Sequence, residues 1–354
     1  MSARQRQVSV IGHFAFGKDY LDGQTVKTKI VTDELSNQLG NDDVLKIDTH
    51  GGKIVLLKAP FQVLKALKKS RNVVIFPARN GLRAYVPLLT FFRMFFKKRK
   101  LHYVVIGGWL PEFLQKKKRL AKKLKRFDGI YVETNTMKKA LEEQDFTNVI
   151  VMPNCKNLKI LKPEELVYPE SLPYKLCTFS RVMKEKGIED AVNAVKQINE
   201  EMGKPVYTLD IYGQVDPGQS QWFDDLKASF PPYVNYCGVV NYDKSVEVLK
   251  NYFALLFPTH FYTEGIPGTI IDAYAAGIPV IASKWESFSD IINDGTGIGY
   301  DFDSGNGLTE ILLLVANTPT IIFDKKMQCL TEAEKYRTES AIKVLIKQLT
   351  GDDI

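Results

Sequence analysis

The segment from Glu264 to Ser283 combines carboxylates with a glycine-containing turn. Glu264 precedes a turn that ends at Gly268, and a helical pattern that carries Asp272 in its first turn follows at once. Such a turn directs unpaired backbone N–H groups and the positive end of a helix dipole at one place, which favours phosphate. The carboxylates repel phosphate but accept hydrogen bonds from hydroxyl groups. A phosphate flanked by polyols indicates a nucleotide-sugar.

A purely structural interpretation of the same segment stays open. Gly265 and Gly268 could form an ordinary turn, and Glu264 could cap the helix that follows. Glycine turns before helices are common, so the functional interpretation depends on polar residues elsewhere in the chain.

Three other segments of the second half place polar residues or glycines after strand-like runs. Arg181 and Lys186 follow the first run, where two cations would neutralise a diphosphate and stabilise it as a leaving group. A solvated basic turn is the alternative. The other two runs end in Asp210-Ile-Tyr-Gly213 and in Gly238-Val239, and a glycine after a strand is usually only a turn.

In their order and spacing, these residues resemble the retaining GT-B glycosyltransferases of family 4, also called glycosyl transferases group 1. The resemblance runs through most of the second half. The family members that the chain resembles are those that bacteria use for capsule, exopolysaccharide and lipopolysaccharide synthesis. It implies an enzyme, a hexosyltransferase that moves a sugar from a nucleotide diphosphate donor, by analogy a UDP-sugar, to a lipid-linked saccharide. The family signature has two glutamates separated by seven residues, whereas this chain has Glu264 and Asp272.

The resemblance also implies roles for the matching residues. Arg181 and Lys186 would bind the donor diphosphate and Glu264 would bind hydroxyls of the transferred sugar, so these three are the expected catalytic residues. Asp272, one methylene shorter than the family's glutamate, would hold the ribose. The backbone N–H groups of Gly268, Thr269 and Ile270 would meet the distal phosphate, and Gly213 and Val239 would border the base. Gly265 and Ile266, in the turn before Pro267, are further expected donor-binding residues. Pro267 has no N–H, so a contact that glycine could make there is missing or replaced.

The first half carries the remaining donor candidates. The family has a glycine-rich loop before the first helix, where this chain has Asp22, Gly23 and Gln24. Asp22 stands in place of one of the two usual glycines. The backbone at Gly23 would approach the donor diphosphate, and Gln24 would lie beside it.

Two residues of the first half are candidates for the acceptor side. His13 is either a general base or an ordinary loop histidine, since a base must first lie within reach of its proton. Trp109 is either a wall of the acceptor site or a core residue. Many family members have a histidine near this strand end, whereas this chain has Gly-Gly-Trp109, so we assign no catalytic histidine there.

Strand-like and helix-like runs alternate along the chain, which predicts βαβ units with parallel sheets. Expected strands are 8–11, 44–47, 73–76, 103–106, 129–132, 149–152, 176–179, 207–212, 234–236, 254–257 and 280–282. Expected helices are 25–38, 61–69, 82–97, 111–126, 136–143, 188–202, 221–230, 244–251, 269–276, 286–293 and 331–349. The pattern and the resemblance predict an α/β protein of GT-B type, with two Rossmann-like doubly wound domains that face a cleft.

The domain boundaries follow from a Pro- and Lys-containing link near residues 154–174. We expect an acceptor- and membrane-facing domain at 1–158 and a nucleotide-sugar-binding domain at 172–330. Residues 331–354 form a C-terminal helix that crosses back to the first domain.

Composition excludes several other classes of protein. Four widely spaced cysteines without a CxxC pair favour neither a zinc site nor a disulfide framework, which makes a reducing cytoplasm the default. No apolar run reaches the roughly 18 residues of a membrane span, and the N-terminus lacks a signal peptide. We expect no cofactor and no metal, because Arg181, Lys186 and helix dipoles can neutralise the donor.

The charge is concentrated in one segment. Residues 97–126, from Lys97 to Arg126, contain twelve Lys or Arg and one acid, a local charge of +11, so the rest of the +7 chain carries −4. Aromatic and apolar residues among these cations are typical of a surface that rests on anionic lipid. A solvated face or a nucleic-acid surface is the alternative, but no stacking platform accompanies the charge. We therefore expect a protein bound peripherally to the inner face of the cytoplasmic membrane.

Two other functions suit the same architecture. A nucleotide-sugar epimerase would release a rearranged free sugar and would not need the basic segment. A non-catalytic scaffold that binds nucleotide-sugar or lipid would show no donor turnover. The sequence does not specify the oligomeric state.

Overall fold

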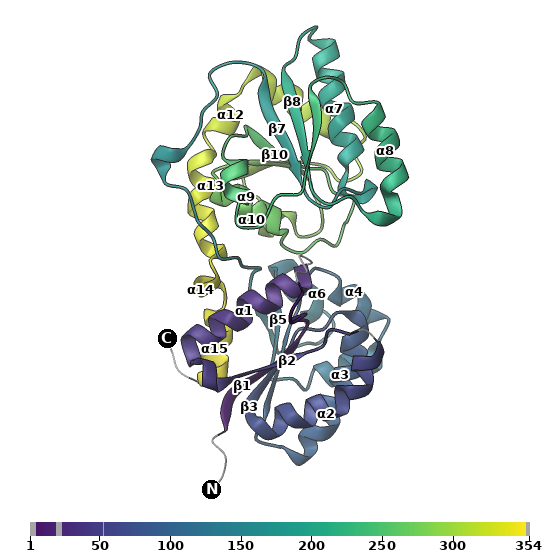
Figure 1. Cartoon of the computed structure of the whole chain (residues 1–354), viewed down its shortest axis with the longest axis vertical. Coiled ribbons are helices and arrows are strands. Elements are labelled where there is room, and N and C mark those ends of the chain that lie inside the picture. Colours follow the sequence, from purple (N-terminus) through teal and green to yellow (C-terminus); the bar gives the residue numbers. More distant parts are fainter. Residues whose placement is uncertain (1–4, 19–22, 52, 352–354) are drawn as a thin grey trace. The chain divides into compact units, whose positions relative to one another are not determined.

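The computed structural model describes residues 5–18, 23–51 and 53–351, and the chain forms two compact units (Figure 1). The first unit contains the chain up to Asn157 together with the segment from Tyr336 onward. The second unit is Leu158–Lys335. Each unit is built around one parallel sheet, as the alternating pattern predicts, and each sheet has six strands.

The first sheet has the strand order β2-β1-β3-β4-β5-β6. Its strands are β1 Arg6–Gly12, β2 Val44–Asp48, β3 Ser70–Ile75, β4 Lys100–Val104, β5 Gly129–Val132 and β6 Val149–Val151. Its helices are α1 Gly23–Leu39, α2 Lys53–Lys69, α3 Arg79–Phe92, α4 Leu110–Gln115, α5 Lys118–Leu124, α6 Asn135–Glu142, α14 Thr338–Ala341 and α15 Lys343–Thr350.

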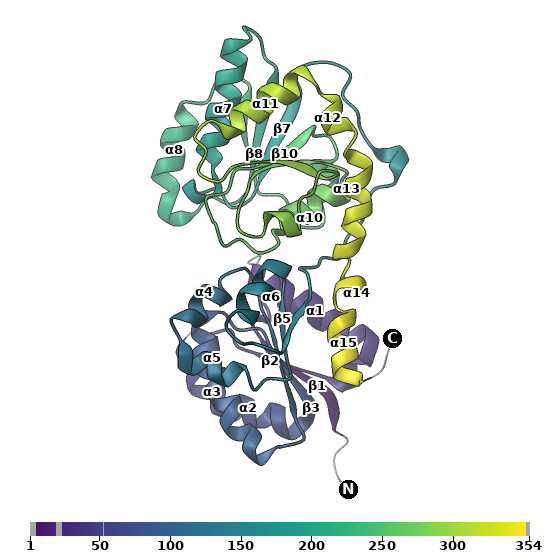
Figure 2. The ribbon, with the colours of Figure 1, turned by 180° about the vertical axis from the view of Figure 1, so that it is seen from behind.

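Alternate residues of these strands pack on opposite faces of the first sheet. Val73 and Ile75 join the core beneath α2 to α6, whereas Val74 joins the core beneath α1, α14 and α15. The C-terminal helices therefore complete the first unit, and they lie beside α1 in both views (Figures 1 and 2).

The second sheet has the order β12-β11-β10-β7-β8-β9. Its strands are β7 Tyr174–Phe179, β8 Tyr207–Tyr212, β9 Val234–Gly238, β10 Ala254–Phe257, β11 Val280–Ser283 and β12 Gly297–Tyr300. Its helices are α7 Ile188–Glu201, α8 Ser220–Ala228, α9 Ser245–Leu249, α10 Gly268–Ala275, α11 Gly307–Asn317, α12 Thr320–Phe323 and α13 Lys326–Ala333. Helices α7 and α11 lie side by side on one face of this sheet (Figure 2).

The order of the second sheet reverses between β7 and β10. The chain proceeds from β7 through β8 to β9 at one edge and then returns to place β10 on the other side of β7. Open parallel sheets bind ligands in the crevice at the carboxyl ends of the two strands where the order reverses. The loops after β7 and β10 therefore define the candidate site.

The expected helix 111–126 is wrong, because the chain forms two helices with Lys116 and Lys117 between them. Lys117 has φ −129° and ψ 54°, outside the helical region. A continuous helix would turn Leu114 and Leu120 to different faces, since each residue advances by about 100°. The break buries both leucines in the core.

Three other expectations differ from the structure in the second half. The expected helix 286–293 is only a short turn at Phe288–Asp290, and the expected helix 331–349 is divided among α13, α14 and α15. Strand β12 and helices α11 and α12 were not expected. Glycine is depleted in strands, yet a Cβ on Gly297 of β12 would lie 2.3 Å from the carbonyl oxygen of Val280, so only glycine fits there.

A buried ion pair joins α1 to the end of β5. Lys27 Nζ lies 2.6 Å from Glu133 Oε1, both side chains are 3% exposed, and Lys27 also donates to the carbonyl of Val105. Removing one partner of such a pair leaves an uncompensated buried charge. The pair therefore holds α1 in one position over the sheet.

No single helix in the described part of the chain has the length and apolar composition of a membrane span. The segments Gly307–Asn317 and Thr320–Tyr336, bent by 98°, meet those criteria only when taken together.

Candidate functional site

Lys186 and Glu264 form an ion pair between the loops that follow β7 and β10. Both side chains are 17% exposed, so the pair is largely shielded from water. Thr259 lies 3.5 Å from the same Glu264 oxygen. Two residues that are 78 positions apart in the chain thus meet at the reversal point of the sheet.

Two glycines allow these loops to lie against neighbouring backbone. Gly187 has φ +66°, and a Cβ there would lie 1.9 Å from the carbonyl oxygen of Pro258. Gly213 has φ +137°, and a Cβ there would lie 1.7 Å from the carbonyl oxygen of Ser180. Both positions therefore need glycine, for backbone conformation and for space.

Aromatic rings surround the Lys186 ammonium. Its Nζ lies 5.4 Å from the ring centre of Phe257 and 4.9 Å from that of Phe261. A partly desolvated cation over a ring face gains from the quadrupole of the ring. Neither phenylalanine was singled out from the sequence, because an aromatic residue near a strand end is usually core.

Helix α10 begins at Gly268, and its N-cap residue Pro267 makes no side-chain cap hydrogen bond. The Oγ1 of Thr269 is buried and has no hydrogen-bond partner among the described residues. Uncapped N–H groups and an unpaired hydroxyl at one helix start suit an anionic ligand. Ile266 and Ile270 are buried, so only their backbone groups can meet a ligand.

The sequence predicted Asp272 in the first turn of the helix. It lies in the second turn of α10 instead, because the helix starts at Gly268. Its side chain is 4% exposed. The ribose role stays a prediction for this buried carboxylate.

Of the other predicted donor residues of the second unit, Arg181 and Val239 are exposed, Gly213 is half-buried and Gly265 is buried. Arg181 has a side chain that is 56% exposed and lies 3.6 Å from Asp216, a carboxylate that the sequence did not indicate. Val239 is 58% exposed, and no atom lies within 4 Å of a Cβ built on Gly238. A planar base can therefore reach the backbone at this strand end.

In the first unit, the Asp48 carboxylate organises the loop after β1. It accepts hydrogen bonds from the backbone N–H groups of Phe14, Ala15 and Phe16 at 3.0, 3.2 and 3.1 Å, and from that of His50 at 2.8 Å. Burial acts to raise the pKa of Asp48, but these N–H donors together hold its pKa below the ordinary value.

This loop places His13 in a hydrogen-bonded chain. Its Nδ1 lies 2.6 Å from Thr25 Oγ1, and its Nε2 lies 3.0 Å from His50 Nδ1. Both ring nitrogens of His13 are thus used within the protein, so a role as general base stays a prediction. Asp48 and His50 were not found from the sequence, because no motif connects them.

The remaining predicted residues of the first unit lie at helix starts. Gly23 begins α1, and Gln24 donates a hydrogen bond of 3.3 Å to the carbonyl of Phe76. Asp22 lies outside the described residues. Trp109 packs partly buried against the core, and its Nε1 donates to the carbonyl of Ile106 at 2.8 Å.

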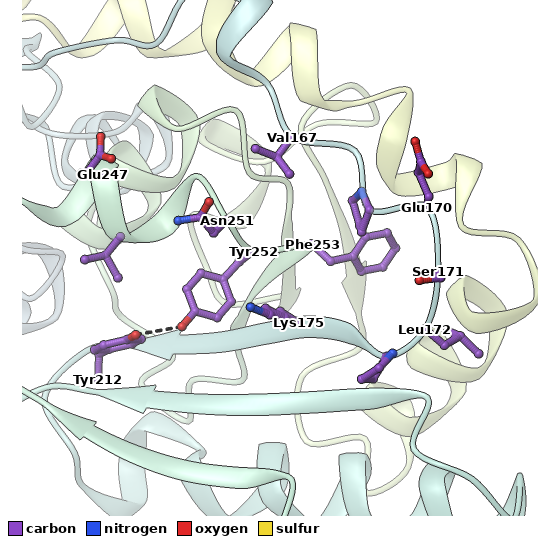
Figure 3. A pocket seen from close by; sticks show the side chains of 13 residues that line it. Val167, Glu170, Ser171, Leu172, Lys175, Tyr212, Glu247, Asn251, Tyr252 and Phe253 are labelled. Atoms are coloured by element: carbon purple, nitrogen blue, oxygen red, sulfur yellow. Dashed lines mark hydrogen bonds between the residues drawn. The ribbon is translucent and has the colours of Figure 1, made fainter.

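A pocket of about 860 Å³ in the second unit contains none of the predicted residues (Figure 3). It lies among the segment 167–173, α9 and the adjoining strands, with Lys175, Tyr212 and Tyr252 on its walls. The Tyr252 hydroxyl shares a hydrogen bond of 2.8 Å with the Tyr212 hydroxyl and donates one of 2.7 Å to the Asp210 carboxylate. Because these polar groups satisfy one another, the loops after β7 and β10 remain the better candidate site.

We expect Gly213→Ala to destabilise the protein by more than about 2 kcal/mol, since it adds a backbone clash to the strain of a positive φ. Urea unfolding followed by circular dichroism measures the change. Gly203→Ala is the matched control, because Gly203 has φ +62° with no atom within 4 Å of its Cβ position. Equal losses in the two variants would show that the contact with Ser180 does not require glycine.

Comparisons with known proteins agree with this architecture. Residues 173–324 match the family model described as Glycosyl transferases group 1. The structure of HepE from Anabaena in complex with UDP and glucose has a TM-score of 0.72 at 13% identity, covering 98% of this chain and 100% of that one. No curated protein sequence matches the chain.

Two other solved structures are similar. Sucrose-phosphate synthase from Thermosynechococcus elongatus has a TM-score of 0.73 at 15% identity, covering 98% of each chain. The structure of TarM has a TM-score of 0.64 at 15% identity, covering 84% of this chain and 58% of that one, so this chain spans less than two thirds of TarM. The neighbours and the two parallel sheets show the GT-B fold expected from the sequence. The matched domain indicates that the protein is a glycosyltransferase.

Proposed function

We propose that the protein is a retaining glycosyltransferase of family 4 that transfers a sugar from a UDP-sugar to a lipid-linked saccharide in bacterial surface polysaccharide synthesis. The observation that carries the proposal is the Lys186–Glu264 pair at the reversal point of the second sheet, in the unit whose α10 start is uncapped. HepE, which has the same fold, was solved with UDP and glucose.

The donor site needs no metal in this proposal. Lys186 and Arg181 neutralise the diphosphate, and the N–H groups at Gly268 and Thr269 bind its distal phosphate. Glu264 then leaves Lys186 and accepts hydrogen bonds from hydroxyls of the sugar.

The reaction breaks the bond between the anomeric carbon and the diphosphate oxygen. The acceptor oxygen bonds to that carbon on the face that the diphosphate leaves, which retains the configuration. The acceptor proton passes to the leaving phosphate oxygen, so no side-chain nucleophile is required.

The basic segment Lys97–Arg126 supports a membrane-bound acceptor. Lys116, Lys117, Lys118 and Arg119 are all exposed. Phe91, Met94 and Phe95, just before the segment, are 52%, 56% and 71% exposed. Exposed aromatic residues beside cations suit the surface of an anionic bilayer, where each cation contributes about 1 kcal/mol. The protein then works at the inner face of the cytoplasmic membrane.

Replacing Lys116, Lys117, Lys118 and Arg119 by Gln is expected to release the protein from anionic vesicles at low salt, a binding loss measured by co-sedimentation. The matched control neutralises four exposed lysines of the second unit, Lys196, Lys204, Lys227 and Lys244, and should leave binding unchanged. Equal binding by wild type and the first variant would contradict the membrane role of the segment.

The function itself is tested by incubating the protein with several nucleotide-sugars and a bacterial membrane extract. Release of nucleoside diphosphate that depends on the extract, with the sugar recovered on lipid in its original anomeric form, is the expected result. A rearranged free sugar without extract would identify an epimerase. Nucleotide binding without turnover would identify a scaffold.

A further inference from the structure

Two arginines of α3 lie against two aromatic rings of the following segment. The guanidinium carbon of Arg79 is 5.5 Å from the ring centre of Trp109, and that of Arg83 is 5.3 Å from the ring centre of Phe113. The two arginines are four residues apart, and so are the two aromatic residues. The members of each such pair therefore lie on one side of their segment. We call these four residues the arginine ladder.

The aromatic half of the ladder is held in place by the first unit. The Trp109 indole is fixed by its bond to the Ile106 carbonyl, and both rings pack against the core. The two rings meet edge to face, with centres 5.3 Å apart and an interplanar angle of 76°. The arginines therefore rest on a rigid platform, which reduces the entropy lost when they bind a ligand.

The arginine half of the ladder is exposed, and no ion pair joins Arg79 or Arg83 to an acid among the described residues. The nearby Glu112 pairs with Lys116, and the hydrogen bond and charge of Lys116 and, less strongly, the charge of Arg79 lower its pKa. A guanidinium in a cation–π contact with an aromatic ring keeps N–H groups available for a bidentate oxyanion. This differs from Lys186 and Arg181, whose charges lie beside Glu264 and Asp216.

The ladder stands at the carboxyl edge of the first sheet, where open parallel sheets bind ligands. Helix α3 follows β3 directly, its N-cap Ala78 makes no side-chain cap bond, and its first turn contains no acid. The helix dipole thus adds positive potential beside Arg79.

We propose that the arginine ladder binds the diphosphate that joins the saccharide acceptor to its lipid. This assignment rests on the proposed function. Side chains at i and i+4 are about 5–6 Å apart at Cβ, so each guanidinium can meet one of two adjacent phosphoryl groups. Phosphate oxygens also occur in bilayer headgroups, and the experiment separates these two sources.

The test uses the full-length protein saturated with UDP, so that the donor site is occupied, and geranyl diphosphate as the probe. Calorimetric titration should show binding to wild type and at least about tenfold weaker binding to the double variant Arg79→Gln, Arg83→Gln. The control, Lys68→Gln with Lys69→Gln, removes the same charge from exposed positions at the end of α2, outside the basic segment, and should bind within about twofold of wild type. Melting curves check that all three proteins fold.

Equal affinity of wild type and the arginine variant for geranyl diphosphate, or no binding by wild type, would overturn the proposal. A second experiment measures binding to vesicles of phosphatidylglycerol, which wild type and the arginine variant should bind equally. Loss of vesicle binding with geranyl diphosphate binding kept would assign the ladder to the bilayer and also overturn it. UDP affinity is measured first, so that failure of the donor site is seen separately from failure of the ladder.

Discussion

Replacing Lys186 with alanine should lower the rate of glycosyl transfer by about a hundredfold or more, the scale of losing one charge-stabilising donor. In the free protein this ammonium neutralises Glu264, and the side chains of both residues are 17% exposed. In the proposed reaction it would neutralise the departing diphosphate. The variant loses both interactions, and release of nucleoside diphosphate from the donor measures the loss in turnover.

Lys184→Ala is the matched control for this prediction. Lys184 lies in the same short turn, but its Nζ stands 5.8 Å from the ring centre of Trp222 and not beside Glu264. Its removal should leave the rate within about threefold of wild type, as expected of an exposed cation. Similar rates in wild type and Lys186→Ala would refute the diphosphate role of Lys186.

Glu264→Gln should reduce turnover by about a hundredfold while UDP affinity stays the same or increases. The carboxylate competes with the diphosphate for Lys186, so removing its charge releases the ammonium for the nucleotide. The sugar, however, loses a charged acceptor for its hydroxyls. Steady-state kinetics and UDP titration measure the two effects separately.

Glu247→Gln on α9 is the corresponding control, because this exposed carboxylate pairs only with its helix neighbour Lys250 among the described residues. Both its turnover and its UDP affinity should match wild type. If Glu264→Gln lost UDP affinity as strongly as turnover, Glu264 would act on the nucleotide and not on the sugar.

The strand ends that carry the candidate site of the second unit could be predicted from the sequence, because each candidate residue follows an apolar strand. The positions of Arg181, Lys186 and Glu264 depend on where β7 and β10 end, and both ends were predicted at Phe179 and Phe257. Strand β12 was missed because the glycines that its close packing requires are also the residues that strands usually avoid.

The interactions of the first unit could not be predicted, because they arise from tertiary contacts without a local pattern. The four N–H groups on Asp48 come from two loops, and the cation–π contact of Arg79 with Trp109 joins residues on different elements. The break at Lys117 likewise depends on burying Leu114 and Leu120 together.

The central claim, that the loop after β7 and the start of α10 bind a nucleoside diphosphate, is tested most directly by melting temperature. UDP should stabilise wild type by about 2.7 kcal/mol at a hundred times its dissociation constant, and uridine at the same concentration should stabilise it much less. The shift with UDP should largely disappear in Lys186→Ala. Equal shifts with UDP and uridine, or a shift that Lys186→Ala retains in full, would contradict the account.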